Sequence, residues 1–146
     1  MRVEWGRLMG AAGWTCLGWP TEHGGRNATM AQQVIFNEEY VRAGAPVRVG
    51  HIGEGLLGPT LIELGSPAQQ ARFLPPIAAG TELWCQGYSE PDAGSDLANV
   101  KTRASLDGDE WVVHGQKVWT SLAQTADWCF VTARTDAWSV RHVGLP

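Results

Sequence analysis

Three absences limit what this chain of 146 residues can be. No apolar run approaches the roughly 20 residues of a membrane-spanning helix, and the first residues, MRVEWGRLMG, lack the long apolar core of a signal peptide. Lysine and arginine are scattered along the chain, and the net charge of -4 creates no basic surface for a polyanion. We therefore expect a cytoplasmic protein that has no membrane span and binds no nucleic acid.

Metal ligands and reactive groups are also scarce. The three cysteines, Cys16, Cys85 and Cys129, lie far apart and form no C-x-x-C pair, so neither a disulfide framework nor a zinc site is indicated. We expect them to be small buried hydrophobic residues. His51 and Glu54 stand one helical turn apart, but no third ligand follows at a suitable spacing, so we predict no metal site. No hydrolase or nucleoside-triphosphatase motif occurs either.

One glycine pattern invites a functional interpretation that its context excludes. The stretch Gly53–Gly58 matches G-x-G-x-x-G, the phosphate-binding pattern of dinucleotide folds. That fold needs an unbroken helix starting at the loop, whereas Pro59 follows immediately and further prolines interrupt the next segments. We therefore interpret these glycines as helix ends and close helix crossings.

What the sequence does contain divides it into two halves. The first half has helical periodicity: we expect a helix over Val3–Gly13 and an amphipathic helix over Thr29–Gly44, begun by Asn27 or Thr29. Pro75 and Pro76 should force a break in the last of the helices that follow. These shorter helices are expected at Ile52–Leu57, Pro59–Leu64 and Ala68–Ala79.

From Leu83 onward the pattern changes to extended segments. Asp107-Gly108 and His114-Gly115 fall between consecutive segments and suit tight reversals, which favours an antiparallel meander. The predicted fold class is α+β: an N-terminal all-α helical domain at 1–82, followed by a partial antiparallel β-barrel or β-sandwich at 83–146. The expected strands are Leu83–Ser89, Val100–Leu106, Glu110–His114, Lys117–Ser121 and Trp128–Arg134.

The stretch from Trp84 to Asp96 contains the most informative residues of the chain. A strand there leads into a polar loop in which Pro91 fixes its own φ and Gly94 lets the backbone turn without steric cost. Such a loop can direct several N–H groups and hydroxyls at one ligand. Alternatively, it is a polar connector in which Ser95 or Asp96 caps a local turn.

Several strings in fixed order resemble one known family. The paired signature of acyl-CoA dehydrogenases is similar to three strings of this chain: S-E-P-D-A-G-S-D at 89–96, G-Q-K-V-W-T-S at 115–121 and A-D-W at 126–128. Within the family, the chain resembles actinobacterial members. Upstream, G-W-P at 18–20, E-H-G-G at 22–25 and F-L-P at 73–75 follow the order of that family's helical domain. Ser89 and Ser121 stand where the family usually has other residues, Thr in the case of Ser89, and both keep a hydroxyl.

The resemblance implies an FAD-dependent oxidoreductase that removes a proton from Cα and a hydride from Cβ of an acyl-CoA thioester. The hydride passes to flavin N5, and the product is a trans-2-enoyl-CoA. Ser89 would offer its hydroxyl to the polar edge of the flavin, and Trp119 would pack against the ring, which shields a redox-active cofactor from water. Ser95 would also contact the CoA chain of the substrate. The residues that the resemblance assigns to the cofactor are Gln86, Tyr88, Ser89, Gly94, Ser95, Trp119, Thr120 and Ser121.

The same resemblance places the catalytic base, a glutamate, in a C-terminal helical domain, so no residue of this chain is assigned that role. Glu90, between Ser89 and Pro91, is expected to serve loop structure. The chain is therefore expected to be a fragment that begins late, and alone to show no dehydrogenase activity and to retain FAD poorly.

The family also implies partners for a complete protein. These are an acyl-CoA substrate, fatty or steroid, an electron-transfer flavoprotein as electron acceptor, and a homo- or hetero-tetramer. Two alternatives remain open: an acyl-CoA oxidase or flavin monooxygenase relative, and a non-catalytic partner subunit of a mixed acyl-CoA dehydrogenase tetramer.

Overall fold

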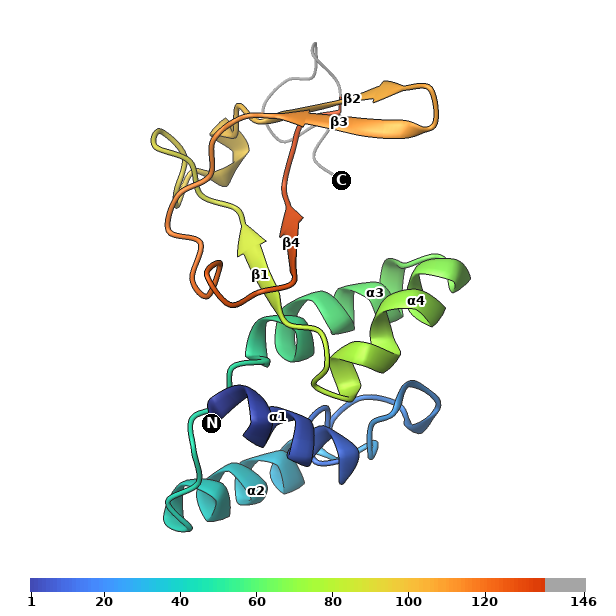
Figure 1. The fold of residues 1–146 in the computed structure, drawn as a ribbon, viewed down its shortest axis with the longest axis vertical. Helices are drawn as coiled ribbons and strands as arrows, with labels where there is room; N and C mark the ends of the chain where they lie inside the picture. The colour runs from blue at the N-terminus through green and yellow to red at the C-terminus, as the bar shows by residue number, and fades with distance from the viewer. Residues whose placement is uncertain (136–146) are drawn as a thin grey trace. The chain divides into compact units, whose positions relative to one another are not determined.

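The computed structural model describes residues 1–135, which separate into two units (Figure 1). A helical unit comprises Met1–Trp84 together with Thr125–Trp128, and a β unit comprises Cys85–Gln124 and the described residues from Cys129 onward. None of the helices in residues 1–135 is long and apolar enough to cross a membrane. The predicted α+β fold class, with helices first and a small sheet region second, is confirmed.

Local capping explains where two of the helices begin. The hydroxyl of Thr29 accepts a hydrogen bond from Gln32 N–H while the Gln32 side chain accepts one from Thr29 N–H, and Ser66 forms the same capping box with Gln69. Of the two residues that could begin the amphipathic helix, Asn27 and Thr29, the structure has Thr29 as the N-cap. The α-helices are α1 Arg2–Ala11, α2 Met30–Arg42, α3 Gly58–Leu64 and α4 Pro67–Ala78.

The predicted break at Pro75 and Pro76 is wrong, because both prolines lie inside α4. An interior proline lacks an N–H and crowds the carbonyl four residues earlier, but these two fall in the last turn of the helix. There their own carbonyls accept hydrogen bonds from Ala79 N–H and Thr81 N–H. The helix therefore runs through the prolines and ends at Ala78.

The glycine-rich stretch is part of a helix and not a phosphate loop. Gly53–Leu57 forms a π-helical turn that leads directly into α3. The indole Nε1 of Trp19 donates to the carbonyl of Glu54 at 2.9 Å, which supports this irregular turn from outside. Gly58 lies against the ring of Trp19, and its lack of a side chain allows this close crossing.

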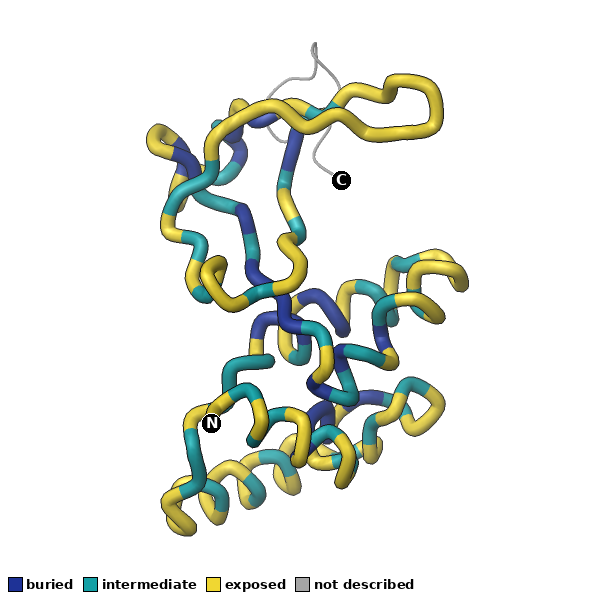
Figure 2. The backbone as a smooth tube through the Cα atoms, viewed as in Figure 1, coloured by how far each residue is buried: buried dark blue, intermediate teal, exposed yellow. Residues whose placement is uncertain are grey.

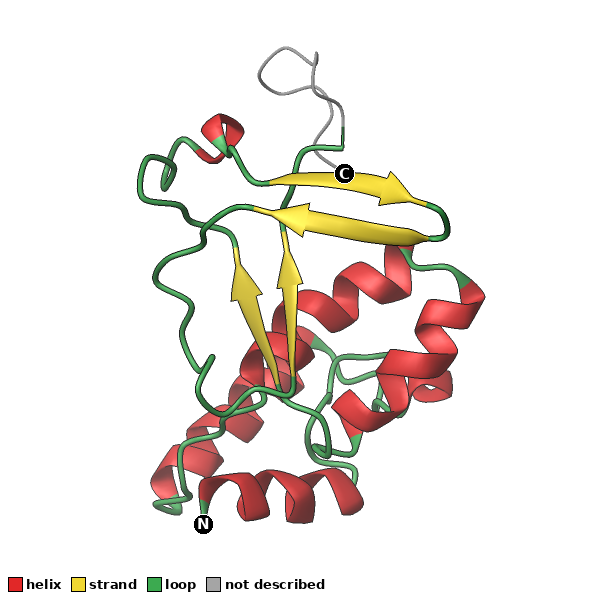
Figure 3. Ribbon diagram, turned by 45° about the horizontal axis from the view of Figure 1, so that its top comes forward, coloured by secondary structure: helices red, strands yellow, loops and turns green. Residues whose placement is uncertain are grey.

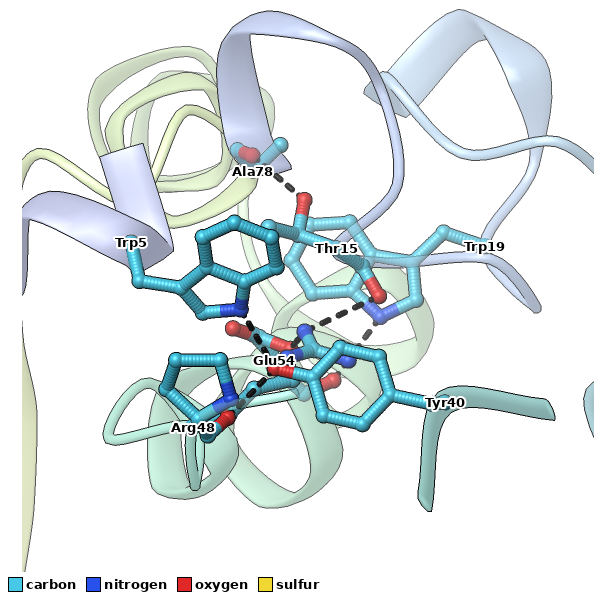
Figure 4. A network of polar contacts seen from close by, with 8 residues as sticks. Trp5, Thr15, Trp19, Tyr40, Arg48, Glu54 and Ala78 are labelled. Atoms are coloured by element: carbon cyan, nitrogen blue, oxygen red, sulfur yellow. Dashed lines mark hydrogen bonds and ion pairs between the residues drawn. The ribbon is translucent and has the colours of Figure 1, made fainter. Parts of the chain in front are cut away.

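A polar network joins separate segments of the helical unit (Figure 4). Arg48 forms an ion pair with Glu54 and donates to the carbonyl of Thr15 at 3.1 Å, while Thr15 Oγ1 donates to the carbonyl of Ala78 at 2.6 Å. Both charged side chains are largely buried, at 19% and 12% exposure. Buried charges are tolerated when they are paired, as these are, although Arg48 Nε itself is buried without a hydrogen-bond partner among the described residues.

The strands form two separate two-stranded sheets. The antiparallel pair β2–β3 is a hairpin whose register sets Arg103 opposite His114 and Asp107 opposite Glu110, as the turn at Asp107-Gly108 predicted. Figure 2 shows that this hairpin is almost wholly exposed among the described residues. The strands are β1 Trp84–Gly87, β2 Arg103–Asp107, β3 Glu110–His114 and β4 Trp128–Val131.

The other pair departs from the predicted antiparallel meander. β1 pairs with β4, and the two strands run in the same direction (Figures 1 and 3). Trp128 N–H donates to the carbonyl of Leu83, and Thr132 N–H donates to the carbonyl of Gly87, each at 3.2 Å. Long-range pairing has overridden the preference for joining consecutive strands.

Two further expectations fail. Lys117–Ser121 is not a strand, because Trp119 in its middle has φ +58°, a value incompatible with extended backbone. Cys16 and Cys85 are buried as expected, but Cys129 is exposed, since it lies on β4, most of which is exposed.

The contact between Gly58 and Trp19 gives a direct test of the helical unit. A Cβ on Gly58 would lie 1.9 Å from Cζ2 of the Trp19 ring. Gly58→Ala should therefore lower the free energy of unfolding by about 1–3 kcal/mol, because the ring or the helix must shift. A Cβ on Gly55, in the same helical stretch, would have no described atom within 4 Å, so Gly55→Ala is the control and should lose no stability. Urea unfolding measures both, and an equal loss in the two variants would contradict the assignment of the effect to Trp19.

Candidate functional site

The polar loop after β1 is held by its own backbone. Glu90 and Ala93 exchange two hydrogen bonds, N–H to O at 2.7 Å and 3.1 Å, which close a tight turn around Pro91. Lys101 and Asn99 reach back to this turn, where Lys101 Nζ donates to the Asp92 carboxylate at 2.7 Å. The loop is therefore an ordered structure and not a loose connector.

The side chain of Glu90 lies at the centre of this arrangement. Its two carboxylate oxygens accept three hydrogen bonds: Lys101 N–H at 2.6 Å, Thr102 N–H at 2.9 Å and Lys117 Nζ at 2.9 Å. Glu90 is 7% exposed, and the side chain of Lys117 is 12% exposed. Each oxygen of this buried carboxylate therefore has at least one donor from the protein.

These contacts set the proton affinity of Glu90. Burial alone would raise its pKa, but hydrogen bonds from Thr102, Lys101 and Lys117 outweigh burial and lower the pKa to about 2. A carboxylate that holds protons so weakly at neutral pH is a poor general base. The geometry agrees with the expectation that Glu90 serves loop structure.

Lys117 ties the loop to the segment that contains Trp119. Its ammonium donates both to Glu90 and to the carbonyl of Tyr88 at 3.0 Å, while the next residue, Val118, donates its N–H to the carbonyl of Ser89 at 2.9 Å. Three consecutive residues, 88–90, are thus fixed by two consecutive residues, 117–118. This brings Ser89 near the chain that leads into Trp119.

Trp119 has the most unusual environment of the predicted site residues. Its side chain is 87% exposed, and its backbone adopts the left-handed region at φ +58°. A bulky residue pays a steric penalty there, and such outliers gather at functional sites. A large aromatic ring held outward on a constrained backbone is available to stack on a planar ligand.

The remaining predicted residues fall into two groups. Gln86, Tyr88, Ser89 and Thr120 are half-buried, whereas Gly94, Ser95 and Ser121 are exposed. Gln86 lies on β1, and its Oε1 is buried without a hydrogen-bond partner among the described residues. An unpaired buried polar atom on the strand that leads to Ser89, with an exposed aromatic ring nearby in the fold, fits a planar polar cofactor such as flavin.

A concave region lies within the helical unit, away from these residues in the sequence, with a cavity volume of about 480 Å³. It is lined in part by Cys16, Trp19, Gln33, His51 and Glu54. Burial raises the pKa of the Cys16 thiol to about 11, against the smaller lowering effects of Thr15 and Arg48, so this thiol is not an activated nucleophile. Residues 1–135 contain no cluster of three metal-ligating side chains, and His51 and Glu54 gain no third ligand.

Comparison with known proteins decides the family. The sequence matches the acyl-CoA dehydrogenase N-terminal domain over residues 2–81 and the acyl-CoA dehydrogenase middle domain over residues 85–145. The chain belongs to the acyl-CoA dehydrogenase family. The resemblance inferred from the strings at 89–96 and 115–121 is therefore confirmed, and so is the assignment to an enzyme family, since relatives are named acyl-CoA dehydrogenases, which are oxidoreductases.

Individual relatives of the family extend this result. The chain is 65% identical over 144 residues to acyl-CoA dehydrogenase IpdE1 of Mycobacterium tuberculosis, covering 99% of this chain and 37% of that protein. Its fold is similar to the solved Tcur3481-Tcur3483 steroid ACAD, with a TM-score of 0.90 and 39% identity over 99% of this chain and 37% of that one. The ChsE4-ChsE5 complex from Mycobacterium tuberculosis gives a TM-score of 0.84 and 46% identity over 92% and 34% of the two chains.

One part of this site could not be found from the sequence. The sequence predicts a structural role for Glu90 in the loop without identifying its partner, and it gives Lys117 no role beyond its place in the G-Q-K-V-W-T-S string. The two charged residues stand 27 positions apart, and no local pattern connects them. Only the fold shows that Lys117, two residues before the exposed Trp119, pairs with Glu90, directly after Ser89.

The lowered pKa of Glu90 predicts a specific pH dependence of stability. Glutamate titrates near 4.5 in the unfolded chain and about 2 in the folded chain, so the unfolded chain binds the extra proton first as the pH falls. The stability from Glu90 is fully present above pH 4.5 and should be lost between pH 4.5 and 2. Glu90→Gln should lower the free energy of unfolding at pH 7 by about 3–5 kcal/mol and flatten its decline in this window.

Chemical denaturation at a series of pH values measures both effects. Glu39→Gln is the control, because it removes a carboxylate from an exposed ion pair on α2 and should cost less than about 1 kcal/mol. A Glu90→Gln variant with the stability and the acid slope of the parent chain would contradict the assignment.

Proposed function

We propose that this chain forms the helical domain, at 1–82, and the flavin-binding β domain, at 83–146, of a cytoplasmic FAD-dependent acyl-CoA dehydrogenase. The reaction is α,β-dehydrogenation of an acyl-CoA thioester to a trans-2-enoyl-CoA. Family membership supports the reaction class. The carrying observation in the structure is Trp119, an exposed ring on a constrained backbone beside the Ser89 loop.

When bound, FAD supplies the hydride acceptor that no protein side chain can provide. The residues of this chain would hold and orient it: the Gln86 amide and the Ser89 hydroxyl would meet its polar edge, and Trp119 would cover the ring. Thr120 and Ser121 follow Trp119 directly and would approach the reacting side of the ring. Tyr88, packed on Phe130 with ring centroids 5.4 Å apart, fixes the base of the loop.

Exclusion of water is the second contribution of these residues. Trp119 presents a broad apolar face, and such a face against the ring would keep solvent from the reacting carbons. Gly94 leaves open space at the turn, and the adjacent Ser95 is exposed, so the CoA chain of a substrate can pass there. Glu90 accepts three hydrogen bonds from the protein and takes no part in moving a proton.

We propose a steroid-derived acyl-CoA as the substrate class, because one related structure is named a steroid ACAD. An electron-transfer flavoprotein would accept the electrons. The chain spans 37% of the length of IpdE1, so these proposals concern the whole protein. A chimera in which this chain replaces the matching segment of Mycobacterium tuberculosis IpdE1 provides a complete enzyme in which they can be tested.

The chimera should bind FAD and, without oxygen, its flavin absorbance should bleach when an acyl-CoA is added. Turnover with a dye acceptor should be at least about tenfold faster with a steroid side-chain thioester than with a straight-chain fatty acyl-CoA, since pocket complementarity typically gives roughly 10–200-fold discrimination. Reduction by neither thioester would contradict the dehydrogenase assignment, and rapid reoxidation of the flavin by oxygen would favour an oxidase.

A non-catalytic partner subunit is a second candidate, because two related structures are named as two-component proteins, ChsE4-ChsE5 and Tcur3481-Tcur3483. Co-expression of the chimera with a second subunit of the family separates the two functions. Flavin retention and activity only in the mixed assembly would favour the partner role, whereas activity of the chimera alone would favour the enzyme.

Trp119 offers a residue-level test of the flavin site. Trp119→Ala in the chimera should change the absorbance spectrum of the bound flavin and weaken FAD binding by about tenfold, since stacking on an aromatic ring is typically worth about 0.5–1.5 kcal/mol beyond burial. Trp111→Ala is the matched control, because Trp111 is also exposed, at 57%, but lies on the β2–β3 hairpin. Identical spectra and FAD affinities in the two variants would remove Trp119 from the site.

A further inference from the structure

We infer that Lys117, paired with Glu90, is a positioning residue that sets Ser89 and Trp119 at a fixed separation. This inference deepens the proposed function and rests on the flavin site described above. Neither residue is expected to touch the cofactor. Their effect on it would act through the backbone of residues 88–90 and 117–119.

The first observation is the way Lys117 spans Ser89. Its ammonium donates to the carbonyl of Tyr88 at 3.0 Å and to Glu90 Oε1 at 2.9 Å, the residues on either side of Ser89. The carbonyl of Ser89 itself accepts Val118 N–H at 2.9 Å. Lys117 and Val118 therefore hold Ser89 and both of its chain neighbours in place by hydrogen bonds.

The second observation is that Glu90, which accepts the hydrogen bond from Lys117, is itself held by other hydrogen bonds. Its carboxylate also accepts Lys101 N–H at 2.6 Å and Thr102 N–H at 2.9 Å, so it cannot follow Lys117 if that side chain moves. The carboxylate of Glu90 is held in place and in turn fixes the position of the Lys117 ammonium. Because Trp119 lies only two residues after Lys117, fixing Lys117 also restricts the backbone of Trp119.

The third observation concerns the stem of Lys117. A Cβ on Gly87 would meet Lys117 Cγ at 3.2 Å, Val131 Cγ2 at 3.3 Å and Cys129 Sγ at 3.4 Å. The aliphatic part of Lys117 thus packs closely over the backbone of β1, next to β4. A lysine whose stem is packed and whose charge is bonded twice has little freedom to change rotamer.

The strained backbone of Trp119 explains why such a brace is needed. A left-handed φ for a bulky residue persists only where the surroundings fix it. Within the described residues, the hydrogen bonds of Lys117 and Val118 lie directly before it. Loss of the ammonium should therefore release Trp119 toward ordinary backbone angles and move its ring.

The test compares Lys117→Met with Lys101→Met. Both remove a lysine charge from the same loop region, but Lys101 is 68% exposed and bonded by its side chain to Asp92, and its backbone N–H to Glu90 survives the change. In the 146-residue chain without flavin, hydrogen exchange at the Val118 amide should accelerate about tenfold or more in Lys117→Met and stay unchanged in Lys101→Met. Unchanged exchange in Lys117→Met overturns the inference, whether or not the chain binds flavin.

The chimera with IpdE1 provides the second measurement. Lys117→Met should weaken FAD binding about tenfold and shift the spectrum of the flavin that does bind, whereas Lys101→Met should do neither. If the parent chimera binds no FAD, the proposed function fails, and the exchange experiment alone decides the inference. If Lys117→Met lowers only the melting temperature and leaves spectrum and FAD affinity unchanged, Lys117 is merely structural and the inference is overturned.

Discussion

The hydrogen bonds of the Glu90 carboxylate hold the main segments of the β unit together. It receives the backbone of residues 101–102 before β2 and the ammonium of Lys117 after β3, so it joins both ends of the hairpin to the loop that follows β1. Hydrogen bonds to a charged acceptor are stronger than neutral ones, and a buried charge left without them is costly. The loop, the hairpin and the segment leading to Trp119 therefore have mutually dependent positions.

An apolar cluster could have filled the same space, and it would have cost less desolvation. Apolar side chains are non-directional, however, and would allow the loop to slide against residues 117–118. The Glu90–Lys117 pair fixes an arrangement at the level of single hydrogen bonds. That precision suits a region in which an exposed tryptophan must face a ligand at a defined angle.

The parts of this structure that could be predicted from the sequence are those that depend on neighbours in the chain. The capping box at Thr29 involves a residue three positions away, and the reversal at Asp107-Gly108 depends on a glycine with φ +62°. The left-handed turn at Trp119 could not be predicted, because K-V-W-T-S has the composition of a strand and only distant contacts impose another shape. The family resemblance assigns Ser89 and Trp119 to the same cofactor, whereas no local pattern in the sequence predicts the Lys117–Glu90 pair.

The parallel pairing of β1 with β4 has a consequence for the order of folding. Parallel neighbours need a long crossover, and here every residue between 88 and 127, the hairpin included, forms that connection. During synthesis on the ribosome, Gly87 must wait for the Thr132 amide that bonds its carbonyl, while the β2–β3 hairpin can close as soon as residue 114 has emerged. Until residue 132 has emerged, the edge of β1 that will pair with β4 stays unpaired, and it can form hydrogen bonds with strands of other chains.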